Sequence, residues 1–171
     1  INHLKQLAHE KTISIDLDQI ILGDKDILEG DLKKLAVLLN IDLTDLLISK
    51  YNPDEEVVIY KSREKNKYFF PDPDNPSYKI ETLARAVKMP FMKSFSVYVI
   101  TNKLNKNLNS SLHTYIYNYG DEDVLINWEV DGKDFNDTIK KNDSLYMQPF
   151  VKHGFSCKNS DGKLFIVRVS G

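Results

Sequence analysis

The feature that most constrains the fold of this 171-residue chain is a change in its hydrophobic period near residue 51. Before that point, apolar residues recur three and four positions apart, which is the period of an amphipathic helix. After it, short runs rich in β-branched and aromatic residues have the length and alternation of strands. The turn signal Tyr51-Asn52-Pro53-Asp54 separates the two patterns. We therefore expect a helical domain over residues 1–51 and a β domain over residues 52–171.

The first part of the chain is expected to form several short helices joined by tight turns. The segment from Ser14 to Gly23 offers a serine N-cap, acidic residues in the first turn and a glycine stop. A third helix is expected through Leu32 to Leu39, and Thr44 opens a fourth. Short helices with such turns predict a helix-turn-helix-like bundle.

The charge of this helical part argues against DNA binding, which its helix pattern would otherwise suggest. Residues 1–51 carry six lysines, no arginine and nine acidic residues, a net charge of −3. Lysine and arginine contacts to phosphates supply most non-specific affinity for DNA. We therefore expect no nucleic-acid partner.

The second part of the chain predicts about eight short strands with turns at regular spacing, the pattern of a jelly roll or small barrel. The Asp131-Gly132 and Asp161-Gly162 dipeptides are hairpin signals, and three prolines between Pro71 and Pro76 exclude a regular strand there. The fold class expected is α+β, a helical bundle followed by a β-barrel. The clearest strand-like runs are 57–60, 78–87, 95–100, 112–119, 124–130, 145–147 and 164–169.

Composition indicates a globular protein without a membrane partner. Hydrophobic residues make up 42% and charged residues 28%, and no apolar run approaches the roughly 20 residues needed to cross a bilayer. No basic segment followed by an apolar stretch opens the chain, so no signal peptide is expected. A single cysteine, Cys157, excludes an internal disulfide and fits a reducing, cytoplasmic location.

Two histidines in strand-like runs, His113 and His153, most strongly suggest chemistry. A small β-barrel can bring two imidazoles on different strands to one point. Two such ligands plus one oxygen donor leave the open positions that a non-haem iron oxygenase needs. The third ligand is not apparent from these two runs alone.

The segment from Asn142 to Phe155, in which a turn opens a strand and Pro149 precedes His153, resembles the second motif of a cupin. With the leading helices, it resembles the helix-turn-helix/cupin oxygenases that act on phosphonates. Further matches follow in order along the chain: Glu10-Lys11-Thr12, Tyr60-Lys61-Ser62-Arg63, Glu81-Thr82-Leu83-Ala84 and Ile166-Val167-Arg168-Val169-Ser170-Gly171. The resemblance implies a cupin barrel and an Fe(II)- and O2-dependent oxygenase that cleaves the carbon-carbon bond of 2-hydroxyethylphosphonate.

The resemblance also implies roles for individual residues. In this family two histidines and one Glu or Gln hold the iron, and a lysine from the helical domain pairs with the phosphonate. The candidate metal ligands are then His113, His153, Gln148 and Asn109. A neutral amide oxygen is a weaker iron ligand than a carboxylate, so iron affinity is expected to suffer. Lys11 matches the family lysine, and Arg168 on the last strand is the second expected phosphonate-binding cation.

Three readings remain open. The chain resembles the degenerate half of a tandem enzyme, which would complete the site of a companion cupin half or of a homo-oligomer. Its start at Ile1 rather than at methionine agrees with a piece of a longer polypeptide. The alternatives from other classes are a ligand-sensing transcription regulator, which the acidic helices disfavour, and a structural cupin in which both histidines only pack.

Overall fold

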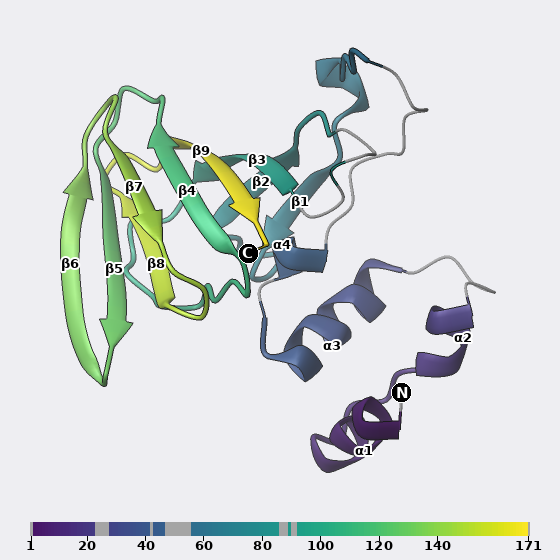
Figure 1. Ribbon diagram of the computed structural model, residues 1–171. Helices are drawn as coiled ribbons and strands as arrows, with labels where there is room; N and C mark the ends of the chain where they lie inside the picture. The colour runs from purple at the N-terminus through teal and green to yellow at the C-terminus, as the bar shows by residue number, and fades with distance from the viewer. Residues whose placement is uncertain are drawn as a thin grey trace. The chain divides into compact units, whose positions relative to one another are not determined.

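The computed structural model describes residues 2–22, 28–41, 43–46, 56–85, 89 and 92–170. The chain divides into two compact units, Ile1–Leu47 and Ile48–Gly171. Figure 1 shows helices along the first unit and strands along most of the second. The expected boundary at Tyr51-Asn52-Pro53-Asp54 lies outside the described residues, so its position stays a prediction.

The first unit contains four described helices. They are α1 (Asn2–Glu10), α2 (Leu17–Leu22), α3 (Glu29–Leu39) and α4 (Leu43–Leu46). Ala8, Leu17 and Leu38 form a buried cluster, against which further apolar side chains of the same segments pack. Helix α3 ends at Leu39, and the next residue, Asn40, caps it with a φ of 54°, in the left-handed region that asparagine tolerates. Four short helices were expected, whereas a helix-turn-helix arrangement stays a prediction.

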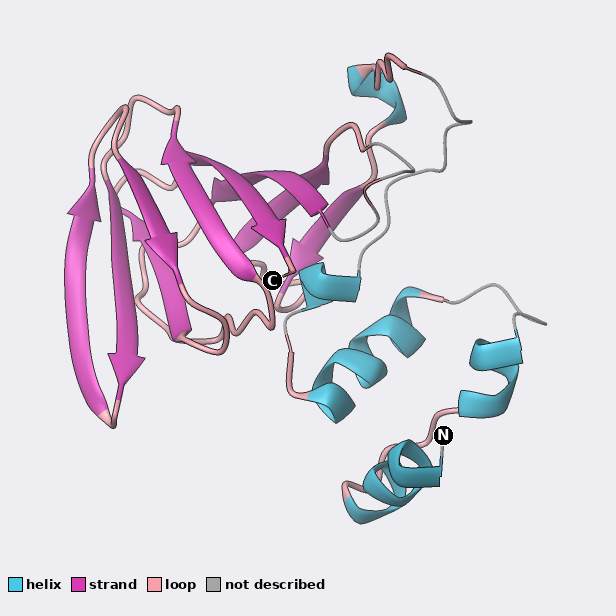
Figure 2. Cartoon of the chain, in the orientation of Figure 1, coloured by secondary structure: helices cyan, strands magenta, loops and turns pink. Residues whose placement is uncertain are grey.

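The second unit is built from a short 3-10 helix and nine strands within its described residues. They are η1 (Ser62–Glu64), β1 (Lys67–Phe70), β2 (Tyr78–Thr82), β3 (Met92–Val99), β4 (His113–Asn118), β5 (Val124–Val130), β6 (Lys133–Ile139), β7 (Ser144–Met147), β8 (Lys152–Cys157) and β9 (Gly162–Val169). One sheet has the order β1-β2-β3-β9-β4-β7 and the other β6-β5-β8, and neighbouring strands are antiparallel. Figure 2 shows these strands in magenta. The mostly β architecture confirms the β part of the predicted fold class.

Three strand predictions need correction. Residues 57–60 do not form a strand, and Val57 and Ile59 are 70% and 65% exposed, because their apolar side chains have no sheet to pack against. The strand expected to begin at Phe95 begins three residues earlier, at Met92, and the strand that begins at Tyr78 ends at Thr82. Strand β6 was not predicted, since its side chains are nearly all polar and exposed at the edge of its sheet.

Alternation along the strands decides which side chains face the interior between the two sheets. On β4, Thr114, Ile116 and Asn118 are buried, whereas Tyr115 and Tyr117 are exposed. The same alternation buries every second residue of β9, and the register of β3 with β9 places Lys93, Phe95, Val97 and Val99 on the same side. We call the buried set the inner face and the exposed set the outer face. The hairpin between β5 and β6 turns at Asp131-Gly132, both with positive φ, as this dipeptide predicts.

No helix in the described part of the chain is long and apolar enough to cross a membrane.

Candidate functional site

His153 lies on the inner face of β8 and is only 1% exposed. It is directly opposite Trp128 on β5 and forms two 3.0 Å backbone hydrogen bonds with Leu108 on its other side. Its Nδ1 lies 2.8 Å from the carbonyl oxygen of Val151. A carbonyl only accepts hydrogen bonds, so Nδ1 carries a proton. In a neutral imidazole, Nε2 would then be the atom that accepts a hydrogen bond or binds a metal.

His113, the first residue of β4, lies on the opposite face of its strand from the buried Thr114. It shares the outer face with Tyr115 and Tyr117. Its Nδ1 lies 2.7 Å from the hydroxyl oxygen of Tyr146, and the two rings stack with centroids 5.9 Å apart. The structure therefore does not bring the two candidate histidines together on one inner face.

The two candidate amide donors lie in different surroundings: Gln148 lines a cavity, and Asn109 has a buried side-chain oxygen. Directly opposed residues on paired strands share a face, so Leu108 shares the inner face with His153. Asn109 follows Leu108 outside any strand and is half-buried with a buried Oδ1, and the next residue, Ser110, is buried. Gln148 is exposed and follows Met147, the buried last residue of β7. The direct strand neighbours of His153 are thus Leu108 and Trp128.

The direct strand neighbours of His153 do not supply a two-histidine, one-carboxylate iron centre. The side chains of Leu108 and Trp128 offer no ligand atom for iron. The described residues contain no group of three or more His, Cys, Asp and Glu side chains that could hold a metal ion. The ligand set inferred from the family resemblance stays a prediction.

Arg168 lies on the inner face of β9 and is only 3% exposed. Its direct cross-strand partners are Lys93 on β3 and Thr114 on β4. Thr114 is in turn directly opposite Met147 on β7. Four adjacent strands therefore present one layer of inner-facing side chains with two cations side by side.

Lys93 is the residue of this layer that sequence reasoning missed. The predicted strand started at Phe95, and only the three additional residues of β3 bring Lys93 into register with Arg168. Its one sequence signal is its position two residues before Phe95, which places both on the same face of a strand.

Lys11 lies in the helical unit, just after α1. Its Nζ donates hydrogen bonds to the backbone carbonyl oxygens of Val37 and Leu38, at 3.2 and 3.3 Å. These carbonyls belong to the last turn of α3, where a cation is favourable. Lys11 thus has a structural role in this unit, and its expected role as a phosphonate ligand stays a prediction.

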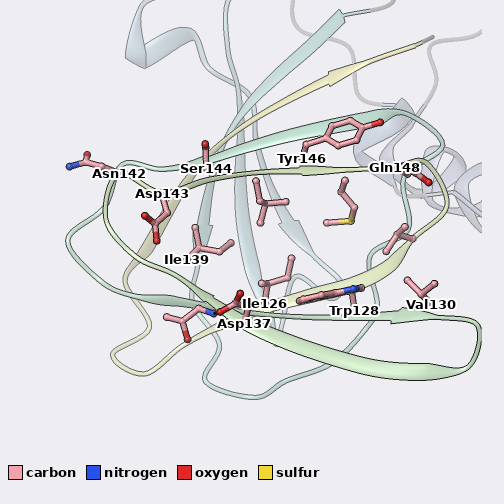
Figure 3. A pocket seen from close by; sticks show the side chains of 14 residues that line it. Ile126, Trp128, Val130, Asp137, Ile139, Asn142, Asp143, Ser144, Tyr146 and Gln148 are labelled. Carbon is pink, nitrogen blue, oxygen red and sulfur yellow. The ribbon is translucent and has the colours of Figure 1, made fainter.

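A cavity of about 740 Å³ opens between the inner faces of β5, β6 and β7. Its apolar lining includes Ile126, Trp128 and Met147, and Figure 3 shows Trp128, Val130 and Gln148 toward one end. Asp137, Asn142 and Asp143 lie toward the other end. The negative charges of Asp137 and Asp143 disfavour binding of an anionic ligand at the end of the cavity where they lie.

Sequence comparison decides the relationship of this chain to known proteins. No protein-family model matches it. Over 142 residues, 82% of its length, it is 32% identical to methylphosphonate synthase of Nitrosopumilus maritimus (strain SCM1). The chain is a homologue of part of methylphosphonate synthase. It spans about 30% of the length of that relative.

Solved structures show that this methylphosphonate synthase homologue shares its fold with two further proteins. Streptomyces albus HEPD, with 2-hydroxyethylphosphonate and Fe(II) bound, matches with a TM-score of 0.64 and 22% identity, over 98% of this chain and 38% of HEPD. Fe(II)-HppE with the alternative substrate (S)-1-HPP matches with a TM-score of 0.60 and 16% identity, over 96% of this chain and 94% of HppE. At these identities the likeness shows the fold alone, and it agrees with the expected cupin-like barrel.

Proposed function

We propose that this chain is part of a non-haem iron oxygenase of the methylphosphonate synthase type. Such an enzyme would use Fe(II) and O2 to convert 2-hydroxyethylphosphonate by cleavage of its carbon-carbon bond. The observation that carries the proposal is the 32% identity over 142 residues to methylphosphonate synthase. The fold shared with HEPD, which holds Fe(II) and 2-hydroxyethylphosphonate, supports it. A ligand-sensing transcription regulator is not favoured by these relationships.

We further propose that this unit completes an enzyme whose iron is held by a companion cupin half, or by another copy in a homo-oligomer. Two observations support the proposal that another unit holds the iron. The chain spans only 30% of methylphosphonate synthase and 38% of HEPD, which leaves room in those proteins for further units. In addition, the direct strand neighbours of His153 are Leu108 and Trp128, neither of which is a metal ligand. The contribution of this chain would be Arg168 and Lys11 as cations for the phosphonate.

The remaining predictions belong to the same proposal. The helices of the first unit would form a helix-turn-helix-like bundle that ends near residue 51, and the protein would act in the cytoplasm. The opposite metal assignment, with iron held here by His113, His153 and Gln148 or Asn109, predicts stoichiometric Fe(II) binding by this chain alone. An anaerobic Fe(II) titration of the wild type and of His113→Ala and His153→Ala separates the two assignments.

The activity is tested with the complete natural protein that contains this chain. The protein is loaded anaerobically with Fe(II), mixed with 2-hydroxyethylphosphonate and O2, and followed by 31P NMR. The expected result is loss of the substrate resonance and growth of a methylphosphonate resonance. Growth of hydroxymethylphosphonate instead would assign a different product to the same bond cleavage. An unchanged substrate resonance, with iron bound and the fold intact by near-UV circular dichroism, would refute the proposed activity.

A further inference from the structure

We propose that the cavity between β5, β6 and β7 is a binding site for a small organic cation, an ammonium group carried on an apolar chain or ring. Such a ligand differs in charge from the phosphonate of the proposed function, and the site does not rest on that function. It rests on the position, the lining and the charge of the cavity.

The cavity lies where the two sheets end beside each other. Strand β6 is an edge of the three-stranded sheet, and β7 is an edge of the six-stranded sheet. Among the described strands, none pairs β6 with β7, so no backbone ladder closes the space between these two edges. That space has a volume of about 740 Å³, within the range of roughly 300–1,000 Å³ that is usual for small-molecule sites. A small ligand can therefore enter between the sheets from this side.

The apolar part of the lining suits the body of the ligand. Ile126 on β5 and Met147 on β7 are only 4% and 7% exposed, and Trp128 is half-buried. The indole ring of Trp128 stacks on Phe135 of β6 with ring centroids 5.8 Å apart, which holds it in place. Figure 3 shows Trp128 and Val130 toward the same end of the cavity. Aliphatic and aromatic side chains of this kind favour burial of an alkyl or aryl group.

The charged part of the lining selects a cation. The described residues that line the cavity include two carboxylates, Asp137 and Asp143, and no lysine, arginine or histidine. Both carboxylates lie away from the Trp128 end (Figure 3). Asp137 belongs to the inner face of β6, because it is directly opposite the buried Ile126. Two negative charges in one cavity attract an ammonium group and repel a carboxylate or a phosphonate.

Neither carboxylate is neutralised by an ion pair in the part of the chain that the structure describes. Asp137 accepts a hydrogen bond from the backbone N–H of Thr138, and Asp143 accepts one from the backbone N–H of Lys140. Each carboxylate keeps further lone pairs for a ligand. The side chain of Lys140 does not line the cavity, and the ammonium of Lys141 pairs with a carboxylate outside it.

Isothermal titration of the intact chain with hexylammonium, 1-hexanol and hexanoate tests the site, because these probes share one alkyl chain and differ in charge. We expect saturable binding of hexylammonium that is at least about tenfold tighter than binding of hexanoate. Affinity should rise about twofold to fourfold per methylene from butylammonium to hexylammonium, as the chain is buried. Trp128 is the single tryptophan and lines the cavity, so its emission should shift to shorter wavelength as the alkyl chain displaces water.

Substitution of the carboxylates separates charge from shape. Asp137→Asn and Asp143→Asn should each raise the Kd of hexylammonium about twofold to fivefold, and the double variant about tenfold, as expected for exposed charge pairs. The affinity for 1-hexanol should stay unchanged. Asp134→Asn is the matched control, because Asp134 lies on the same strand, does not line the cavity and pairs with Lys106. It should leave the Kd of hexylammonium unchanged.

Three results would overturn the proposal. They are absence of saturable hexylammonium binding, binding of hexanoate or 1-hexanol as tight as that of hexylammonium, and an unchanged hexylammonium affinity in the folded double variant. Both carboxylates are exposed, so their replacement by asparagine is compatible with folding. The oxygenase assay bears only on the proposed function, because neither iron nor 2-hydroxyethylphosphonate enters this titration.

Discussion

Substitution of Gly154 by alanine tests the packing that places Leu108 beside His153. A Cβ on Gly154 would lie 1.5 Å from the carbonyl oxygen of Asn105, 2.7 Å from its carbonyl carbon and 3.1 Å from Oδ1 of Asn127. The first two atoms are backbone, so no side-chain rotation relieves the clash. The segment at Asn105 would have to move by more than an ångström, and Leu108 follows only three residues later.

The expected cost has two parts. Forced displacement in a packed region costs about 1–3 kcal/mol, and each of the two backbone hydrogen bonds between Leu108 and His153 is worth about 1 kcal/mol if it is lost. We therefore expect Gly154→Ala to lower the free energy of unfolding of the β unit by about 2–5 kcal/mol. Gly154 does not have a positive φ, so backbone strain adds nothing to this figure.

Urea unfolding followed by tryptophan fluorescence measures this effect, because Trp128 is the single tryptophan and lies directly opposite His153. Gly30→Ala is the control, since a Cβ there meets nothing within 4 Å. Gly30 lies in helix α3, so this change should stabilise the helical unit by about 0.5–1 kcal/mol. It should not lower the urea midpoint that Trp128 fluorescence reports for the β unit. A urea midpoint of Gly154→Ala equal to that of the wild type would mean that the segment at Asn105 moves at no energetic cost. The packing that places Leu108 beside His153 would then be refuted.

Three further perturbations have defined outcomes. Tyr78→Phe should destabilise the β unit by about 1–3 kcal/mol in urea unfolding, because the buried hydroxyl bonds both the amide and the carbonyl of Phe155. Asn118→Ala should cost at least as much in the same assay, because its side chain bonds three backbone groups while it is fully buried. The hydrogen bond from the Lys141 ammonium lowers the pKa of the exposed Asp121 carboxyl below its ordinary value. The pair therefore stabilises the fold at pH values above the ordinary carboxyl pKa, and this stabilisation is lost as the pH falls through the lowered pKa of Asp121. An NMR titration of Asp121 should show its pKa return upward in Lys141→Met, and no movement would contradict the pairing.

Local patterns in the sequence predicted the elements of this protein well. Alternation of apolar and polar residues predicted most strands, and the Asp131-Gly132 dipeptide predicted the tight hairpin. Both signals depend on the backbone period and on a few adjacent residues, so they are readable without long-range contacts. The same reasoning missed β6, because an edge strand with two exposed faces lacks an apolar alternation. It also placed a strand at residues 57–60, whose apolar side chains have no neighbouring strand.

The tertiary structure decided which side chains share the interior. A strand presents successive residues to opposite faces, so an error of one residue moves a candidate ligand from the inside to the outside. Sequence matching selected His113, whereas the pairing of β4 with β9 places its neighbour Thr114 on the buried face with Arg168. The sequence by itself determined most of the elements and the family relationship. The faces of the strands, and with them the partnership of Lys93 and Arg168, depend on register between segments far apart in the chain, which only the folded structure sets.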